Sequence, residues 1–225
     1  MMDLTQAEEA SRLLVTHWRE GKVLAALPDA LRPQSRLEGY AIQTQLERLS
    51  AKPLWGWKIA ATSSAGQKHI GVDGPLAGRI LAEMVYPNGA ILPFGANRMA
   101  VAEAEFAFRI GHSILPREKP YSMDEVLNAV AALHLGIEVP DSRFADFVTA
   151  GAPQLIADNA CAHQFVLGPE APAYWRGMDL AQHRVIGRVG KRYEREGVGA
   201  NVLGDPRIAL TWIANELSRH GVTLA

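Results

Sequence analysis

One segment in the middle of the chain constrains the fold more than any other. Residues 101–110, VAEAEFAFRI, alternate between two kinds of side chain. In an extended chain Phe106 and Phe108 face one way, whereas Glu103 and Glu105 face the other. A helix would mix the two sets around its axis. The segment therefore predicts a strand, and a chain built around it must contain a β-sheet.

Helical patterns lie on either side of this strand. We expect helices from Thr5 to Gly21, over about 37–51, from Ser122 to just before Gly136, and from Asp205 to Gly221. Shorter strand candidates are 56–60, 90–93, 136–139, 164–167 and 184–195, the last with an exposed hairpin over 188–196. Helices near the ends and strands in the middle predict an α+β fold with a mainly β core.

The length and composition are typical of one folded domain. With 225 residues, 48% of them hydrophobic, we expect a single domain over 1–225, helical over 1–51 and a β core over 52–225. A formal net charge of -1 supplies no overall field for nucleic acid or anionic lipid, so we expect neither partner. An acidic start, the lack of a long apolar stretch and a single cysteine predict a cytoplasmic protein.

Three glutamates are candidates for a metal site. Glu103 and Glu105 share one face of the strand, and like charges this close raise each other's pKa unless water or a cation compensates. Glu138 lies in the apolar stretch 133–139, which predicts burial, and a buried carboxylate needs a partner. An all-oxygen set suits Mg²⁺ or Mn²⁺. A solvated strand face also explains the first two glutamates, so the residues alone leave both interpretations open.

Other charged residues lie in unusual surroundings. Lys58, within the apolar segment 55–60, either reaches solvent or turns inward toward anions, and the three carboxylates favour the inward arrangement. Asp158 and Asn159 end an apolar run, which is typical of a turn, although a role in a site stays open. Arg143 either grips a carboxylate of a ligand or pairs locally.

Several segments, taken in chain order, carry a resemblance to a known family. They are 56–59, Thr62-Ser63, 71–75, 101–108, 138–143, 157–160 and 202–206. Together they resemble the hydratase/decarboxylase branch of the fumarylacetoacetate hydrolase superfamily. The resemblance implies a mixed β-roll core with peripheral helices, usually in a homo-oligomer. It also implies that Mg²⁺ or Mn²⁺ is held by Glu103, Glu105 and Glu138, with Lys58 as the active-site lysine.

The same resemblance implies a reaction. Its main form is metal-dependent hydration of a 2-hydroxypenta-2,4-dienoate-type acid to a 4-hydroxy-2-oxo acid in aromatic catabolism, with Thr62, Ser63, Asp158 and Cys161 as substrate-binding candidates. Decarboxylation of a 4-oxalocrotonate-type acid uses the same dienolate and stays an alternative. Two further alternatives are acylpyruvate hydrolysis, with His69 as the base, and a non-catalytic partner subunit.

The sequence departs from the family pattern at three places. Leu76 stands where hydratases of this group commonly carry Asp, and the decarboxylase branch tends to be apolar there. Cys161 stands where Ser is usual, and a thiol forms poorer hydrogen bonds than a hydroxyl. The chain ends at Ala225, whereas relatives continue with closing strands, so we expect either a truncated chain or a roll completed differently.

Overall fold

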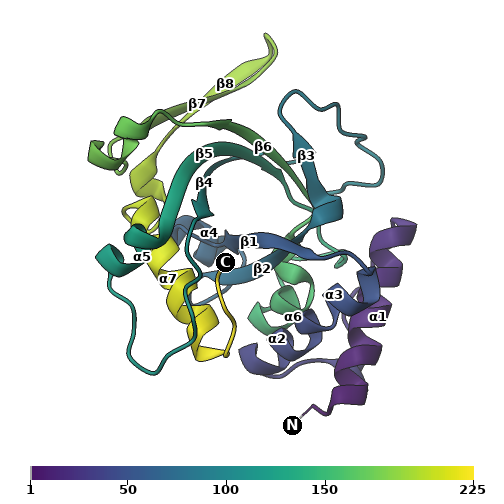
Figure 1. The fold of residues 1–225 in the computed structure, drawn as a ribbon. Coiled ribbons are helices and arrows are strands. Elements are labelled where there is room, and N and C mark those ends of the chain that lie inside the picture. The colour runs from purple at the N-terminus through teal and green to yellow at the C-terminus, as the bar shows by residue number, and fades with distance from the viewer. Residues whose placement is uncertain (1) are drawn as a thin grey trace. The chain divides into compact units, whose positions relative to one another are not determined.

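The computed structural model describes residues 2–225 and contains both helices and sheets (Figure 1). The helices are α1 (Leu4–Glu20), α2 (Arg36–Thr44), α3 (Leu46–Ser50), α4 (Ser64–His69), α5 (Met123–Ala129), α6 (Ala152–Ala157) and α7 (Pro206–Arg219). The strands are β1 (Leu54–Ala60), β2 (Leu76–Leu81), β3 (Val85–Pro87), β4 (Glu103–Ile110), β5 (Val130–Val139), β6 (Gln164–Glu170), β7 (Arg184–Val189) and β8 (Tyr193–Val198).

Two compact units make up the chain. The first consists of Met1–Glu103 and Glu138–Val166, and the second of Ala104–Ile137 and Leu167–Ala225. The strands form an antiparallel pair β1-β2, a four-stranded sheet in the order β3-β6-β5-β4, and an antiparallel pair β7-β8. The combination of helices and sheets agrees with the predicted α+β class, and the single domain over 1–225 stays a prediction.

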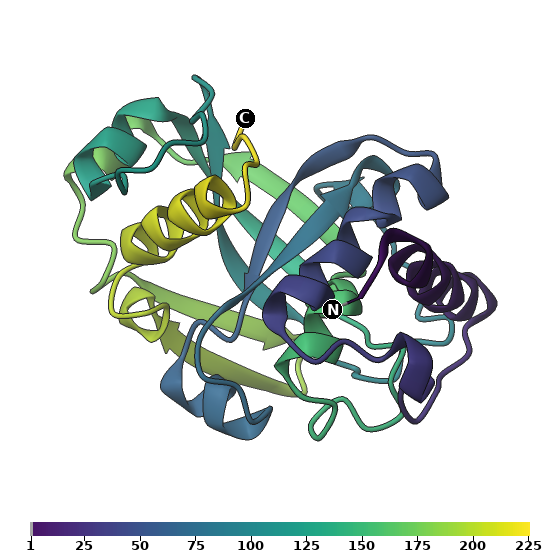
Figure 2. The same ribbon diagram turned by 90° about the horizontal axis from the view of Figure 1, so that it is seen from below.

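In the first unit, helices pack around a small apolar core. α1 begins at a capping box, in which the Asp3 side chain accepts from Gln6 N and the Gln6 side chain accepts from Asp3 N. α1 and α2 pack together, and α2 packs against α6 (Figures 1 and 2). The fully or nearly buried residues of this core are Ala7, Ala10, Leu14, Leu27, Leu31, Ile42, Phe144 and Ala157. This packing fixes α6, which leads directly into the segment 158–161.

In the second unit, α5 packs against α7. Asn215 of α7 ties the preceding loop down, because its side chain accepts from Tyr121 N and donates to Tyr121 O. Asp205 caps α7 and Pro206 is its first residue, as predicted. Strands β7 and β8 form the expected exposed hairpin.

Several sequence predictions about elements were wrong or incomplete, and helices α4 and α6 were not predicted. The helix expected from Ser122 to just before Gly136 ends at Ala129, and Val130 begins β5, because burial in the sheet outweighs the helical spacing of the apolar residues. Residues 90–93 are not a strand, and β3 lies earlier instead. Strand β2 was not predicted at all. Within residues 2–225 no helix combines the length and apolar character needed to cross a bilayer.

Candidate active site

Lys58 lies in the middle of β1, directly opposite Gly78 of β2. Gly78 leaves room for the lysine side chain, because an added Cβ would lie 3.0 Å from Lys58 Cδ and 2.5 Å from the backbone oxygen of Asn159. The contact with the backbone oxygen is too close for any side chain, and the contact with Lys58 Cδ would push the lysine stem aside. The glycine therefore allows both the lysine stem and the segment containing Asn159 to approach β2 closely.

The Lys58 ammonium lies against the Glu138 carboxylate. Nζ is 3.1 Å from Glu138 Oε1, and the two side chains are only 9% and 3% exposed. Nζ also donates to the backbone oxygen of Ala160 at 3.0 Å. The inward orientation predicted for Lys58 is what the structure shows.

Glu138 is a buried carboxylate that is incompletely bonded. Although Oε1 is close to the lysine, it has no hydrogen-bond partner among the described residues. Burial raises the pKa of Glu138, the Lys58 charge opposes this rise, and the neighbouring Glu103 carboxylate adds to it. A buried oxygen of this kind is costly unless something else binds it.

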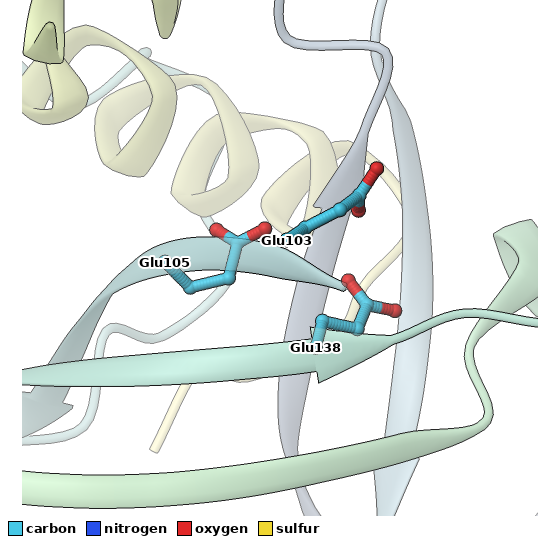
Figure 3. A group of neighbouring side chains, drawn as sticks. All are labelled: Glu103, Glu105 and Glu138. Atoms are coloured by element: carbon cyan, nitrogen blue, oxygen red, sulfur yellow. The ribbon is translucent and has the colours of Figure 1, made fainter. Parts of the chain in front are cut away.

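The three predicted glutamates come together. One carboxylate oxygen of each lies within 4.8 Å of the others (Figure 3). Glu103 is exposed, Glu105 is half-buried and Glu138 is buried, so the group runs from the surface into the protein. The set contains oxygen donors alone, with one buried oxygen still lacking a hydrogen bond, and this chemistry fits a hard divalent cation.

A short left-handed turn carries the carbonyl that contacts Lys58. Asn159, Ala160 and Cys161 have φ values of 57°, 51° and 61°, in a region that non-glycine residues rarely adopt. The Asn159 side chain accepts from Arg79 N at 2.6 Å and donates to Arg79 O at 2.8 Å. These bonds tie the turn to β2.

Asp158 and Arg143 form a second buried ion pair beside this turn. The Asp158 carboxylate accepts from the Arg143 guanidinium, from Arg143 N at 3.0 Å and from Ser142 Oγ at 2.7 Å. Asp158 is 1% exposed, and both of its oxygens are bonded. Burial raises the pKa of Asp158, and the Arg143 charge is the largest effect in the opposite direction. Arg143 therefore pairs locally, one of the two possibilities left open by the sequence.

The other substrate-binding candidates lie near the ends of these elements. Thr62 follows β1 and is half-buried, and Ser63 caps α4 by accepting from Gly66 N at 3.0 Å. Cys161 ends the left-handed turn, and its backbone oxygen accepts from Asp141 N. Burial, followed by the Asp158 charge, raises the pKa of Cys161 to about 12. Substrate contact by Thr62, Ser63, Asp158 and Cys161 stays a prediction.

One residue that shapes this region, Gly78, was missed in the sequence, and the role of a second, Asn159, was left open. Gly78 lies inside a strand, where an isolated glycine often marks close backbone approach, and this signal was available. Asn159 follows Asp158 at the end of an apolar run, a position that predicts a turn but not its attachment to β2. That attachment joins residues far apart in the chain, so no local pattern reveals it.

Comparison with known proteins places the chain among hydratases. No family model matches it. It is 33% identical to 2-keto-4-pentenoate hydratase of Paraburkholderia xenovorans and to 2-keto-4-pentenoate hydratase 3 of Pseudomonas putida, each over 97% of this chain and 81% of the relative. Its fold matches that of 4-oxalocrotonate decarboxylase from Pseudomonas putida G7, complexed with magnesium and adipate. The TM-score is 0.85 at 21% identity, covering 100% of this chain and 85% of that one. The chain belongs to the 2-keto-4-pentenoate hydratase family, as its resemblance predicted.

Proposed function

We propose that the protein is a divalent-metal-dependent hydratase that converts a 2-hydroxypenta-2,4-dienoate-type acid to a 4-hydroxy-2-oxo acid. The observation that carries the proposal is the buried Glu138 carboxylate, which is grouped with Glu103 and Glu105 and paired with Lys58. Family membership supports the same reaction, because the relatives are named as hydratases of this substrate class. In this role the protein is a hydro-lyase.

Glu103, Glu105 and Glu138 would hold the metal, which we propose to be Mg²⁺ or Mn²⁺. The bound ion would supply Lewis-acid stabilisation of negative charge on the C2 oxygen of the substrate. Three carboxylates give a net charge that favours a divalent cation, and the Lys58 ammonium offsets part of the remaining charge. The protein's own contribution is to keep one of these ligands, Glu138, inside the protein.

Lys58 would handle the proton of the substrate C2 hydroxyl. Ketonisation moves this proton from O2 to C5, which gives an enone; water then adds at C4, and C3 takes up a proton. One water molecule is consumed overall and no other reactant is needed. Lys58 suits the proton-handling step because its ammonium is buried, donates to Ala160 O and lies beside Glu138.

The remaining candidates would contact the substrate or support those that do. Thr62, Ser63 and Cys161 each offer a hydroxyl or a thiol close in sequence to Lys58 or to its carbonyl partner at Ala160. Asp158 has both oxygens bonded to Ser142 and Arg143, so it would support the turn over 159–161. We also propose a β-roll core, a homo-oligomer and a cytoplasmic location for this enzyme.

A product assay tests the function. Purified protein with Mg²⁺ is mixed with 2-hydroxypenta-2,4-dienoate, the loss of dienol absorbance is followed, and the product is identified. We expect metal-dependent formation of 4-hydroxy-2-oxopentanoate, which stops on chelation and resumes when Mg²⁺ is added back. Consumption of the dienol that does not depend on metal, or no consumption at all, would overturn the proposal.

One observation favours decarboxylation as a second candidate. Leu76, at the position where hydratases commonly carry Asp, is 1% exposed in β2 and pairs with Ala60 of β1. An apolar residue there is the pattern of the decarboxylase branch. The same assay with 4-oxalocrotonate, measuring CO₂ release, separates the two reactions. Faster CO₂ release than hydration would favour the decarboxylase.

A further inference from the structure

The left-handed turn over 159–161 is costly, and its cost calls for an explanation. A non-glycine residue in the left-handed region costs about 1–2 kcal/mol, and three such residues follow one another here. Strain of this kind persists only when the surrounding structure enforces it, and it is concentrated at functional sites. A turn of this kind places a backbone group where an ordinary turn would not.

That group is the backbone oxygen of Ala160. It accepts from Lys58 Nζ at 3.0 Å, and the same ammonium lies 3.1 Å from Glu138 Oε1. The carbonyl therefore helps to determine where the end of a long, flexible side chain lies. A lysine has several rotatable bonds, so holding its ammonium in one place requires partners on more than one side.

Asn159 is the residue that anchors the turn on the side of β2. Its amide bonds both backbone groups of Arg79, at 2.6 and 2.8 Å, and it is 4% exposed. Arg79 follows Gly78 in β2, and Gly78 faces Lys58. Its lack of a Cβ lets Asn159 O and the lysine stem approach the same point of the strand. Asn159 and Lys58 are thus both held against β2.

Asp158 and Arg143 hold the turn from the opposite end. Arg143 donates both to the Asp158 carboxylate and to the Asp158 backbone oxygen. The backbone oxygen of Cys161 accepts from Asp141 N at 2.9 Å. The turn is therefore fixed at both of its ends, which leaves the Ala160 carbonyl little freedom to move.

We propose that Asn159 is a positioning residue for Lys58, acting through the Ala160 carbonyl. Asn159 does not touch substrate or metal in this scheme; it keeps the lysine ammonium beside Glu138. The proposal rests on the proposed hydratase function in so far as Lys58 takes part in that chemistry. Its structural part, the control of where the Lys58 amine lies, is independent of the reaction.

The main test compares two asparagines that make the same kind of bond. Asn159→Ala removes two hydrogen bonds to Arg79. Asn215→Ala, in the other unit, removes the equivalent two bonds to Tyr121 and a third to Thr211 O. We expect Asn159→Ala to lower kcat about 10- to 100-fold with KM within about threefold, because a misplacement of about 1 Å can cost that much. Asn215→Ala should leave kcat unchanged. Equal kcat values for the two variants would overturn the proposal.

A double-mutant cycle shows whether Asn159 acts through the lysine. In a Lys58→Met background, Asn159→Ala should lower kcat no further, because the group that it positions has been removed. A residue with a general structural role would lower kcat by the same factor in both backgrounds, and this result would contradict the proposal. If Asn159→Ala does not fold, Asn159→Gly replaces it, since glycine accepts the positive φ without strain.

A labelling experiment separates this proposal from the proposed function. Brief acetylation with acetic anhydride, followed by mass spectrometry, gives the reactivity of Lys58 relative to exposed Lys52 in the same sample. We expect reactivity of Lys58 to rise at least threefold in Asn159→Ala and not in Asn215→Ala. Such a rise in a protein without hydratase activity would refute the function and retain the positioning role. Unchanged labelling in Asn159→Ala would overturn the positioning role, whatever the activity.

Discussion

The first unit contains two buried carboxylates, each beside a cation, and they differ in how completely they are bonded. Asp158 accepts from Arg143 N, from the Arg143 guanidinium and from Ser142 Oγ. Glu138 lies 3.1 Å from Lys58 Nζ, but its buried Oε1 has no hydrogen bond among the described residues. Burial raises the pKa of both carboxyl groups. Both pairs therefore carry the cost of desolvation, and only the first is compensated by a full set of bonds.

The difference separates a structural ion pair from one with capacity left for a ligand. A buried pair contributes to stability only when its remaining lone pairs and protons are satisfied. The pair of Asp158 and Arg143 meets this condition and fixes a strained turn. Glu138 does not, and two further carboxylates lie next to it. An incompletely bonded acid beside other acids is the arrangement expected of a cation site.

We call Glu138 and Lys58 the incomplete pair, and Asp158 and Arg143 the complete pair. Replacing Glu138 tests the incomplete pair and should give the largest effect. Glu138→Gln keeps the volume but removes a ligand charge, so we expect the metal-dependent rate to fall at least about 1,000-fold. Two effects on the free energy of unfolding oppose each other: an amide is easier to bury than a carboxylate, but Lys58 loses the charge beside it. We therefore expect the free energy of unfolding to change by less than about 1 kcal/mol. Enzyme assays and urea unfolding measure the two quantities.

The matched control for this change is Glu194→Gln, in an exposed pair with Arg188. It should alter neither the rate nor the affinity for Mn²⁺. Substantial activity of Glu138→Gln at saturating Mg²⁺ would show that Glu138 is not a ligand and that its incomplete bonding has another cause.

Breaking the complete pair should instead affect folding. Arg143→Met leaves Asp158 buried without its cation, and we expect a loss of about 3–5 kcal/mol in the free energy of unfolding, measured with urea. Arg188→Met, in the exposed pair with Glu194, should cost less than about 1 kcal/mol. The double variant Arg143→Met/Asp158→Asn should recover part of the loss. Equal losses of unfolding free energy in Arg143→Met and Arg188→Met would show that the buried pair stabilises the fold no more than an exposed pair does.

The sequence predicted the residues of the incomplete pair better than their surroundings. Alternation over 101–110 gave the strand, and the apolar neighbours of Glu138 gave its burial, because both signals are local. The grouping of the three glutamates was implied by a family resemblance, and the structure brings them together. Their role as metal ligands stays a prediction.

The complete pair was harder to predict, and the reason is physical. Arg143 and Asp158 each have a local interpretation, a paired arginine and a turn-forming Asx residue, and only the fold joins them. Strand β2 was missed because its residues are buried throughout, so no alternation marks it. The helix expected through Val130 and Leu133 failed because short apolar runs fit helix and strand equally well.

The reactivity of the Cys161 thiol tests the negative charge of the neighbouring Asp158 carboxylate. Since burial and the Asp158 carboxylate raise the pKa of Cys161 to about 12, we expect alkylation by iodoacetamide at pH 8 to be about 1,000-fold slower in the folded protein than in urea. Cys161 is the single cysteine of the chain, so mass spectrometry reads the rate directly. Asp158→Asn should speed the folded-state reaction. Equal rates with and without urea would show that the thiol is not buried beside a charge.

The smallest expected effect is the pH dependence of stability due to His163, whose pKa the Arg143 charge also lowers. Burial, followed by the Arg143 charge, lowers the pKa of His163 below its usual 6.5, and Asp141 opposes the shift. Trp18 Nε1 donates to His163 Nδ1 at 2.8 Å, so this nitrogen carries no proton in the folded protein. The unfolded chain therefore takes up a proton at higher pH than the folded one. Stability attributable to His163 is complete above about pH 6.5 and decreases as the pH falls toward the lower folded-state pKa, by at most about 1.4 kcal/mol per pH unit.

Urea unfolding between pH 5 and 7.5 should show this slope in the wild type and a smaller one in His163→Gln. An unchanged slope in His163→Gln would mean that other groups account for it and that the pKa of His163 is not lowered in the folded protein.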